Sequence, residues 1–195
     1  MKKTAFVIYY HRQNFYSLNA IAGALETDKI FESIDFYFSS SKDNLLEIIK
    51  DLVDSYDKIL VGISFFTSQL FETHDLVQKI KNKYKKRCLL VAGGSHSTGD
   101  PFGTLKMGFD IVVVGEGEET IVDLIQKIVT NEELSEVKGI AYNNRENENV
   151  LTNKRELIDL NNDKKFQKYN EKYGNDIVDN LKKAGLSNKI IKQIT

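Results

Sequence analysis

Two short stretches of the sequence gather residues that could contact a ligand, and each follows or ends an apolar run. The first, "VAGGSHSTGDP" (91–101), puts two glycines before a serine, a histidine and a threonine. The second, "GEGEET" (115–120), alternates glycine with glutamate. Glycine permits a tight turn with positive φ, and it also lets a flat or bulky ligand approach the backbone. The residues alone favour neither explanation, and the glutamates equally suit the first turn of a helix.

Other kinds of site have less support in the sequence. Cys88 is the single cysteine, which excludes an internal disulfide and every zinc or iron–sulfur site that needs several cysteines. We expect it to be a small buried core residue. Ser64 stands where a response-regulator receiver would need an aspartate, and no P-loop is present. Because no nucleophile–base pair is visible, we predict no catalytic residue and no protein metal ligand.

Five apolar runs of strand length must position these loops. They alternate with amphipathic stretches of helical periodicity and cover residues 4–10, 33–40, 58–66, 88–94 and 110–117. Four of the runs are almost unbroken, which is typical of parallel strands covered on both faces. We therefore predict an α/β fold, a flavodoxin-like or Rossmann-like five-stranded parallel sheet in the order 2-1-3-4-5, with helices on both faces.

The pattern changes in the last third of the chain. Residues 139–143 and 148–152 are predicted to form a small β-hairpin. We expect one α/β domain over residues 1–153, including this hairpin (139–152), and a polar helical tail over residues 154–195. The tail is rich in lysine and asparagine and too polar to form its own core, so we expect it to pack on the domain or to begin something longer.

Composition argues against several classes of partner. The 195 residues carry a formal net charge of −1, so no global field favours nucleic acid or an anionic membrane. The basic run at residues 79–87 ends a predicted helix and is expected to be a solvated face. No apolar run approaches the ~20 residues that span a bilayer. The apolar start is too short and aromatic for a signal peptide, so we expect a cytoplasmic protein with no membrane or nucleic-acid partner.

The loops at the carboxyl ends of the strands are the expected ligand site, because open α/β sheets bind ligands there. They begin near His11, Ser64, Gly93 and Gly115. Two of the three histidines, His11 and His96, lie in these loops.

Taken together, the loops resemble the cobalamin-binding domains at the N-terminus of many radical S-adenosylmethionine enzymes. That family carries a G-G-x-H-x-T-x-x-P stretch after the fourth strand and a G-E-G-E stretch after the fifth. The matching residues are Gly93, Gly94, His96, Thr98, Pro101, Gly115, Glu116, Gly117 and Glu118. The resemblance covers residues 3–153, about three quarters of the chain.

A second resemblance is to the cobalamin domains of the methionine-synthase type, which share S-x-L followed by G-G. Here residues 64–66, Ser-Phe-Phe, are followed by 26 residues and then by Gly93 and Gly94. In that family the serine and the glycines line a slot for the dimethylbenzimidazole tail of the cofactor. The resemblance implies the same role for Ser64, Gly93 and Gly94.

The D-x-H-x-x-G part of that pattern is missing. Asn14 falls where the cobalt-ligating histidine would be. The resemblance therefore implies a base-off corrinoid without the usual protein histidine ligand. His11 could reach the cobalt, although a strand-end histidine usually ligates nothing, and His96 is assigned to contacts with the corrin. The full set of predicted cofactor-binding residues is Tyr10, His11, Asn14, Ser64, Phe65, Phe66, Thr67, Gly93, Gly94, Ser95, His96, Thr98, Gly115, Glu116, Gly117 and Glu118.

The resemblance also implies a function. Such a domain presents cobalamin so that a methyl group, or another cobalt function, passes to chemistry on a separate radical S-adenosylmethionine domain or protein. That domain holds an iron–sulfur cluster through C-x-x-x-C-x-x-C, and Cys88 alone cannot hold one. We therefore expect either a truncated domain or a stand-alone cofactor module. Two alternatives stay open: a flavodoxin-like module that binds FMN or another nucleotide, and a cofactor-free interaction domain.

Overall fold

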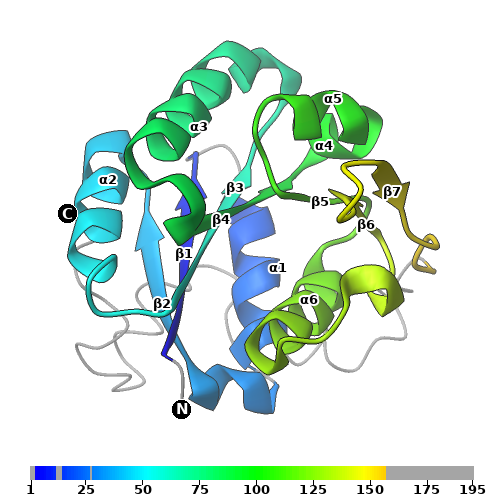
Figure 1. Cartoon of the computed structure of the whole chain (residues 1–195), viewed down its shortest axis with the longest axis horizontal. Helices are drawn as coiled ribbons and strands as arrows, with labels where there is room; N and C mark the ends of the chain where they lie inside the picture. The colour runs from blue at the N-terminus through cyan, green and yellow to red at the C-terminus, as the bar shows by residue number, and fades with distance from the viewer. Residues whose placement is uncertain (1–2, 12–14, 27, 157–195) are drawn as a thin grey trace.

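A seven-stranded sheet forms the centre of the computed structural model, which describes residues 3–11, 15–26 and 28–156 (Figure 1). The strand order is β2-β1-β3-β4-β5-β6-β7. The first five strands are parallel, and β6 and β7 continue the sheet antiparallel to β5. The predicted order of the parallel strands is confirmed. The strand bounds are β1 Thr4–Tyr10, β2 Ile34–Ser39, β3 Lys58–Ser64, β4 Cys88–Gly93, β5 Ile111–Val113, β6 Ile140–Asn143 and β7 Asn149–Leu151.

Helices cover both faces of the sheet, as predicted. One face packs against α1 and α6, and the other against α2, α3 and α5 (Figure 1). The helix bounds are α1 Phe15–Glu26, α2 Lys42–Leu52, α3 Leu70–Tyr84, α4 Ser95–Gly99, α5 Pro101–Lys106 and α6 Glu118–Thr130. Short 3-10 turns are η2 Lys29–Ser33, η3 Thr67–Gln69, η4 Lys85–Arg87 and η5 Leu134–Glu136.

Strand β1 supplies both halves of the core. All seven of its residues are buried, and successive side chains point to opposite faces. Ala5, Val7 and Tyr9 pack on the α2/α3 face, whereas Phe6, Ile8 and Tyr10 pack on the α1/α6 face. This explains why an unbroken apolar run forms the strand. The single cysteine, Cys88, is buried at the start of β4 as predicted, and burial raises its thiol pKa to about 11.

The register of the sheet aligns the ends of three strands. Tyr10 pairs with Ser64, and Ser64 pairs with Gly93. These residues end β1, β3 and β4, so the loops that follow all leave from the same edge of the sheet.

Two segments differ from the sequence prediction in detail. Strand β5 ends at Val113, four residues earlier than predicted, because the chain turns at Gly115 with a φ of 87°. Part of the expected loop at residues 91–101 is the short helix α4. The predicted hairpin exists as β6 and β7, but it belongs to the main sheet.

Nothing described bears on the predicted tail beyond residue 156, and the domain boundary stays a prediction. Among the described residues, no helix is both long and apolar enough to cross a membrane. The cytoplasmic location also stays a prediction.

Candidate functional site

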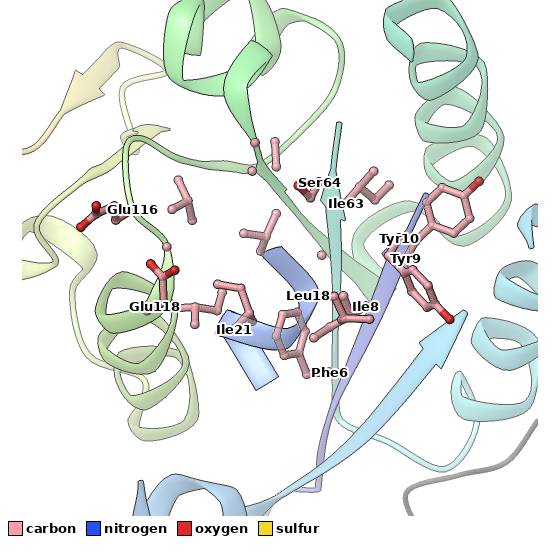
Figure 2. Close-up of a pocket in the computed structure, with 18 of the residues that line it drawn as sticks. Phe6, Ile8, Tyr9, Tyr10, Leu18, Ile21, Ile63, Ser64, Glu116 and Glu118 are labelled. Carbon is pink, nitrogen blue, oxygen red and sulfur yellow. The ribbon is translucent and has the colours of Figure 1, made fainter. Parts of the chain in front are cut away.

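A pocket of about 230 Å³ opens at the carboxyl edge of the sheet, on the face covered by α1 and α6 (Figure 2). Its walls come from β1, β3, β4, β5 and these two helices. The wall is mostly apolar, with Phe6, Ile8, Leu18, Ile21, Val91, Val113 and Ile121. The sequence prediction missed these residues, because an ordinary core produces the same apolar pattern. Gly62 was the available signal, since a glycine inside a strand often marks a close approach.

Eight of the predicted site residues line this pocket: Tyr10, Ser64, Gly93, Gly94, Gly115, Glu116, Gly117 and Glu118. They lie at the ends of four different strands or just after them, so the fold brings together residues that are far apart in the sequence. Seven others lie outside the pocket lining: His11, Phe65, Phe66, Thr67, Ser95, His96 and Thr98. Asn14 lies outside the described residues.

Positions 93 and 94 accommodate glycine for different structural reasons. A Cβ added at Gly93 would meet no atom within 4 Å, so this position borders open space in the pocket. A Cβ at Gly94 would lie 2.7 Å from the Phe65 carbonyl oxygen, and Gly94 has a φ of 95°. Gly94 is therefore required by the backbone itself, whereas Gly93 leaves room. The turn explanation therefore holds for Gly94, while the ligand explanation for Gly93 stays a prediction.

Gly117 allows helix α1 to approach the start of α6. A Cβ there would lie 2.9 Å from Cδ1 of Ile21. Ile21 and Gly117 both line the pocket, so this close contact shapes one of its walls.

Glu118 brings a carboxyl group to this apolar wall. It is the first residue of α6, and Figure 2 shows its side chain beside Ile21. Its Oε2 atom is buried and has no hydrogen-bond partner. Burial raises the pKa of this carboxyl above its usual value, and the hydrogen bonds from the backbone amides of Glu118 and Gly117 only partly oppose that shift.

Helix α4 ties the two glycine-containing loops together. The Thr98 hydroxyl donates to the Gly94 carbonyl (3.1 Å) and accepts from the Gly115 amide (3.0 Å). The buried Ser97 hydroxyl, which the sequence prediction missed, donates to the Gly93 carbonyl (3.0 Å). Thr98 and Ser97 therefore fix the backbone around the pocket mouth.

His96 lies outside the pocket lining and packs on Phe65, which belongs to the α2/α3 side of the core. Its Nδ1 is 3.0 Å from the Thr67 hydroxyl, and its ring packs on Phe65 with the centroids 5.2 Å apart. Phe65 in turn stacks on Phe109 at 6.0 Å. His96 is thus held at the sheet edge by partners within the chain.

His11 follows β1 and faces helices α2 and α3. Its ring packs edge-on against Tyr9 at 5.2 Å. It lies near the Lys42–Glu72 ion pair (2.7 Å), and burial lowers its pKa below the usual value. Its Nε2 is buried without a hydrogen-bond partner. The part of the chain that the structure describes contains no cluster of three or more His, Cys, Asp or Glu side chains that could hold a metal ion.

The chain matches a known protein family and a named relative. The B12 binding domain family matches residues 15–125 of the chain. A protein named uncharacterized methyltransferase PH0819, from Pyrococcus horikoshii, is 31% identical over 96 residues. That match covers 48% of this chain and 21% of the relative.

Solved structures show the same fold. The radical S-adenosylmethionine methyltransferase TsrM from Kitasatospora setae, with cobalamin and a 4Fe-4S cluster bound, matches with a TM-score of 0.62 and 16% identity. The match covers 81% of this chain and 30% of TsrM. The cobalamin-dependent S-adenosylmethionine radical enzyme OxsB, with aqua-cobalamin and S-adenosylmethionine bound, gives 0.58 and 18% identity, covering 86% of this chain and 25% of OxsB. The chain thus spans less than a third of each of these proteins.

Proposed function

This chain belongs to the B12-binding domain family, and we propose that it holds a cobalamin with the nucleotide tail in the α1/α6 pocket and the corrin over the carboxyl edge of the sheet. The open space beside Gly93 is the observation that carries the proposal. In another protein a cavity of about 150 Å³ binds benzene. The pocket here, at about 230 Å³, leaves room for a larger aromatic base.

Each part of the pocket has a task in this proposal. The apolar wall around Ile8 and Ile121 excludes water from the bound base. In this proposal the Ser64 hydroxyl, which lines the pocket at the end of β3, bonds the base nitrogen. Glu116 and Glu118 put carboxyl oxygens beside the start of α6, and these acceptors suit a hydroxyl or amide donor of the cofactor better than a phosphate.

We propose a base-off cofactor without a histidine ligand from this chain. The pocket would keep the tail nitrogen away from the cobalt. His96 is engaged by Thr67, and His11 faces the α2/α3 side of the sheet. A bound cobalamin supplies a cobalt that carries a methyl group or another transferable function. We propose that the reaction itself takes place on a separate radical S-adenosylmethionine domain, as the cofactors named for TsrM and OxsB suggest.

The test is an absorption titration of the full chain with hydroxocobalamin and methylcobalamin. Wild type is compared with Gly93→Leu, which would fill the pocket, and with Gly99→Leu. Gly99 is exposed on α4 outside the pocket lining, and its Cβ also meets open space. Gly94 is unsuitable because its substitution would strain the backbone.

We expect saturable binding with a base-off spectrum in wild type and in Gly99→Leu. Gly93→Leu should weaken binding by about fivefold or more, the effect of ~1–3 kcal/mol of overpacking. If wild type leaves the free cobalamin spectrum unchanged and retains no cobalamin after gel filtration, the proposal is wrong. FMN is then the next ligand to titrate.

A further inference from the structure

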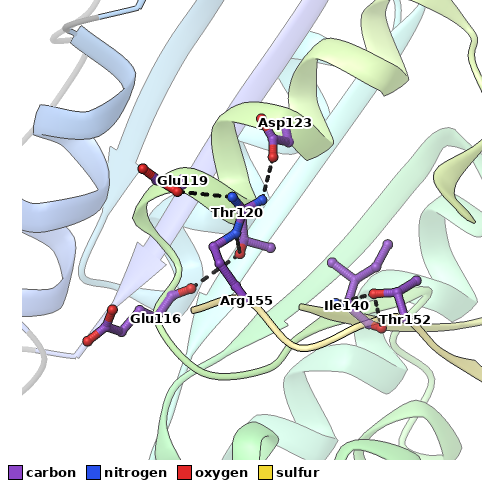
Figure 3. Close-up of polar contacts among 7 residues, drawn as sticks. All are labelled: Glu116, Glu119, Thr120, Asp123, Ile140, Thr152 and Arg155. Carbon is purple, nitrogen blue, oxygen red and sulfur yellow. Dashed lines mark hydrogen bonds and ion pairs between the residues drawn. The ribbon is translucent and has the colours of Figure 1, made fainter. Parts of the chain in front are cut away.

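The segment that follows β7, residues 152–156, is called the exit segment here. The side chain of Arg155 anchors it to the start of α6 (Figure 3). Its Nη1 lies 3.0 Å from Oε2 of Glu119, and its Nη2 bonds Oδ2 of Asp123. Its Nε donates to the Thr120 hydroxyl at 3.0 Å. The Arg155 side chain is only 16% exposed, whereas the side chains of Glu119 and Asp123 are 49% and 48% exposed.

Thr120 connects this guanidinium to the loop at residues 114–118, which we call the pocket loop. Thr120 is fully buried, and its hydroxyl donates to the Glu116 carbonyl at 3.3 Å. Glu116 and Glu118 line the pocket. One hydroxyl therefore links the exit segment and the loop that forms a pocket wall (Figure 3).

The same loop is joined to the hairpin at its other end. The Val114 amide donates to the Gly139 carbonyl (2.8 Å), and the Gly139 amide donates to the Asn153 carbonyl (2.9 Å). Gly139 has a φ of 75°, and a Cβ there would lie 3.2 Å from the Thr120 hydroxyl oxygen. The hairpin, its exit and the pocket loop are thus packed as one unit.

We expect the Arg155 contacts to contribute more to the stability of the fold than a surface ion pair does. On the same hairpin, Arg145 pairs with Glu133, but these side chains are 85% and 73% exposed. Exposed pairs of that kind contribute little. A shielded guanidinium with three partners fixes both distance and direction, because its donors form a rigid planar fork.

We propose that Arg155 is a positioning residue that holds loop 114–118 in the shape that forms the cofactor pocket, and so couples the pocket to the chain that follows β7. The identity of the ligand rests on the proposed function. Coupling of this kind is reciprocal. A ligand in the pocket strengthens the hold on the exit segment, and pulling that segment away weakens ligand binding.

The test compares Arg155→Gln, Arg155→Lys and the control Arg145→Gln in the full chain. Hydrogen exchange of the backbone amides in residues 114–121 is measured without ligand, and cobalamin affinity is measured by absorption titration. We expect faster exchange in Arg155→Gln and an affinity about fivefold lower or more, as for typical couplings between sites. Arg155→Lys should recover part of both effects, and Arg145→Gln should match wild type.

Thr120→Val tests the link without touching either ion pair. It removes the hydroxyl that bonds both Arg155 and Glu116 but keeps the shape of the side chain. A double-mutant cycle with Arg155→Gln should give a combined effect smaller than the sum. If Arg155→Gln does not fold, Arg155→Lys and Thr120→Val carry the comparison.

Unchanged exchange in residues 114–121 together with unchanged cobalamin affinity, in Arg155→Gln and Thr120→Val alike, would overturn the coupling. A wild-type chain that binds no cobalamin would instead overturn the proposed ligand. The exchange measurement on the free protein would then still decide whether Arg155 positions the loop.

Discussion

Glu118 shows how a single residue that lines the pocket can also be a source of instability. Its carboxyl belongs to a mostly apolar pocket wall, and its Oε2 has no hydrogen-bond partner. Desolvation raises its pKa above the usual 4.5, with Glu116 and Glu119 adding to the shift. The folded protein therefore binds a proton more tightly at this site than the unfolded chain does.

We predict that this group lowers stability as pH rises. Between the ordinary pKa and the raised one, the folded state holds more protons than the unfolded state, so the free energy of unfolding falls with increasing pH. Glu118→Gln removes that titration, so its stability relative to wild type should increase as the pH rises above the ordinary carboxyl pKa of 4.5. Urea unfolding at a series of pH values measures it.

The control for this measurement is Glu47→Gln, which makes the same chemical change at an exposed position on α2. Its stability difference from wild type should not follow the trend seen for Glu118→Gln. A Glu118→Gln difference that stayed constant with pH would contradict the prediction.

At the scale of elements, helix α4 does more than connect β4 to α5. Its five residues place Thr98 between two loops, and this one hydroxyl bonds the backbone of both Gly94 and Gly115, from which Thr98 is 4 and 17 positions away in the chain. The pocket mouth therefore depends on the position of α4.

We predict that Thr98→Val destabilises the protein by about 0.5–1.5 kcal/mol, because it removes the hydrogen bond that the exposed Gly115 amide donates to the Thr98 hydroxyl. The side chain keeps its shape, so the change isolates the hydroxyl. Thr130→Val is the matched control, since the exposed Thr130 hydroxyl bonds carbonyls of its own helix and the Glu132 carboxylate just after it, and so bridges no distant loops. Chemical denaturation measures both variants, and equal effects in the two would argue against the bridging role.

Comparison of these elements with the sequence shows what was predictable. Four of the five parallel strands follow from almost unbroken apolar runs, because strands covered on both faces need apolar residues throughout. Their order follows from the five strand–helix repeats. The short β5 was not predictable, since Val114 is as apolar as Val113 and the strand ends through the turn at Gly115. The hairpin could be predicted from its own residues, but its place beside β5 depends on long-range pairing.

The candidate site was predictable to a similar extent. Glycine positions at strand ends indicated the correct edge, because parallel strands end together. The apolar walls were not predictable, because Phe6 and Ile21 have the same pattern as other core residues. The role of Arg155 was also missed, since only the fold brings it beside Thr120.

At the scale of the whole molecule, two different sites lie at opposite ends of the parallel strands. The pocket occupies the carboxyl edge, and a polar network occupies the amino edge. There the Tyr56 hydroxyl donates to Asp35 (2.6 Å) and meets the Tyr37 hydroxyl at 2.8 Å. The Lys3 ammonium lies 3.5 Å from Asp35 and 4.2 Å from the centre of the Tyr56 ring. This network joins the segments around β1, β2 and β3 at the end opposite to the pocket.

We predict that Tyr56→Phe lowers stability without changing cofactor binding. Loss of the hydrogen bond to Asp35 should cost about 1–2 kcal/mol in urea unfolding, while the cobalamin titration stays as in wild type. Burial and the bond to Asp35 raise the pKa of Tyr56 to about 12 from 10.0. The folded state then holds the phenolic proton more tightly, so wild-type stability should fall as pH rises from 10 toward 12, and fall less in Tyr56→Phe. A weaker cobalamin affinity in this variant would show that the two edges are coupled after all.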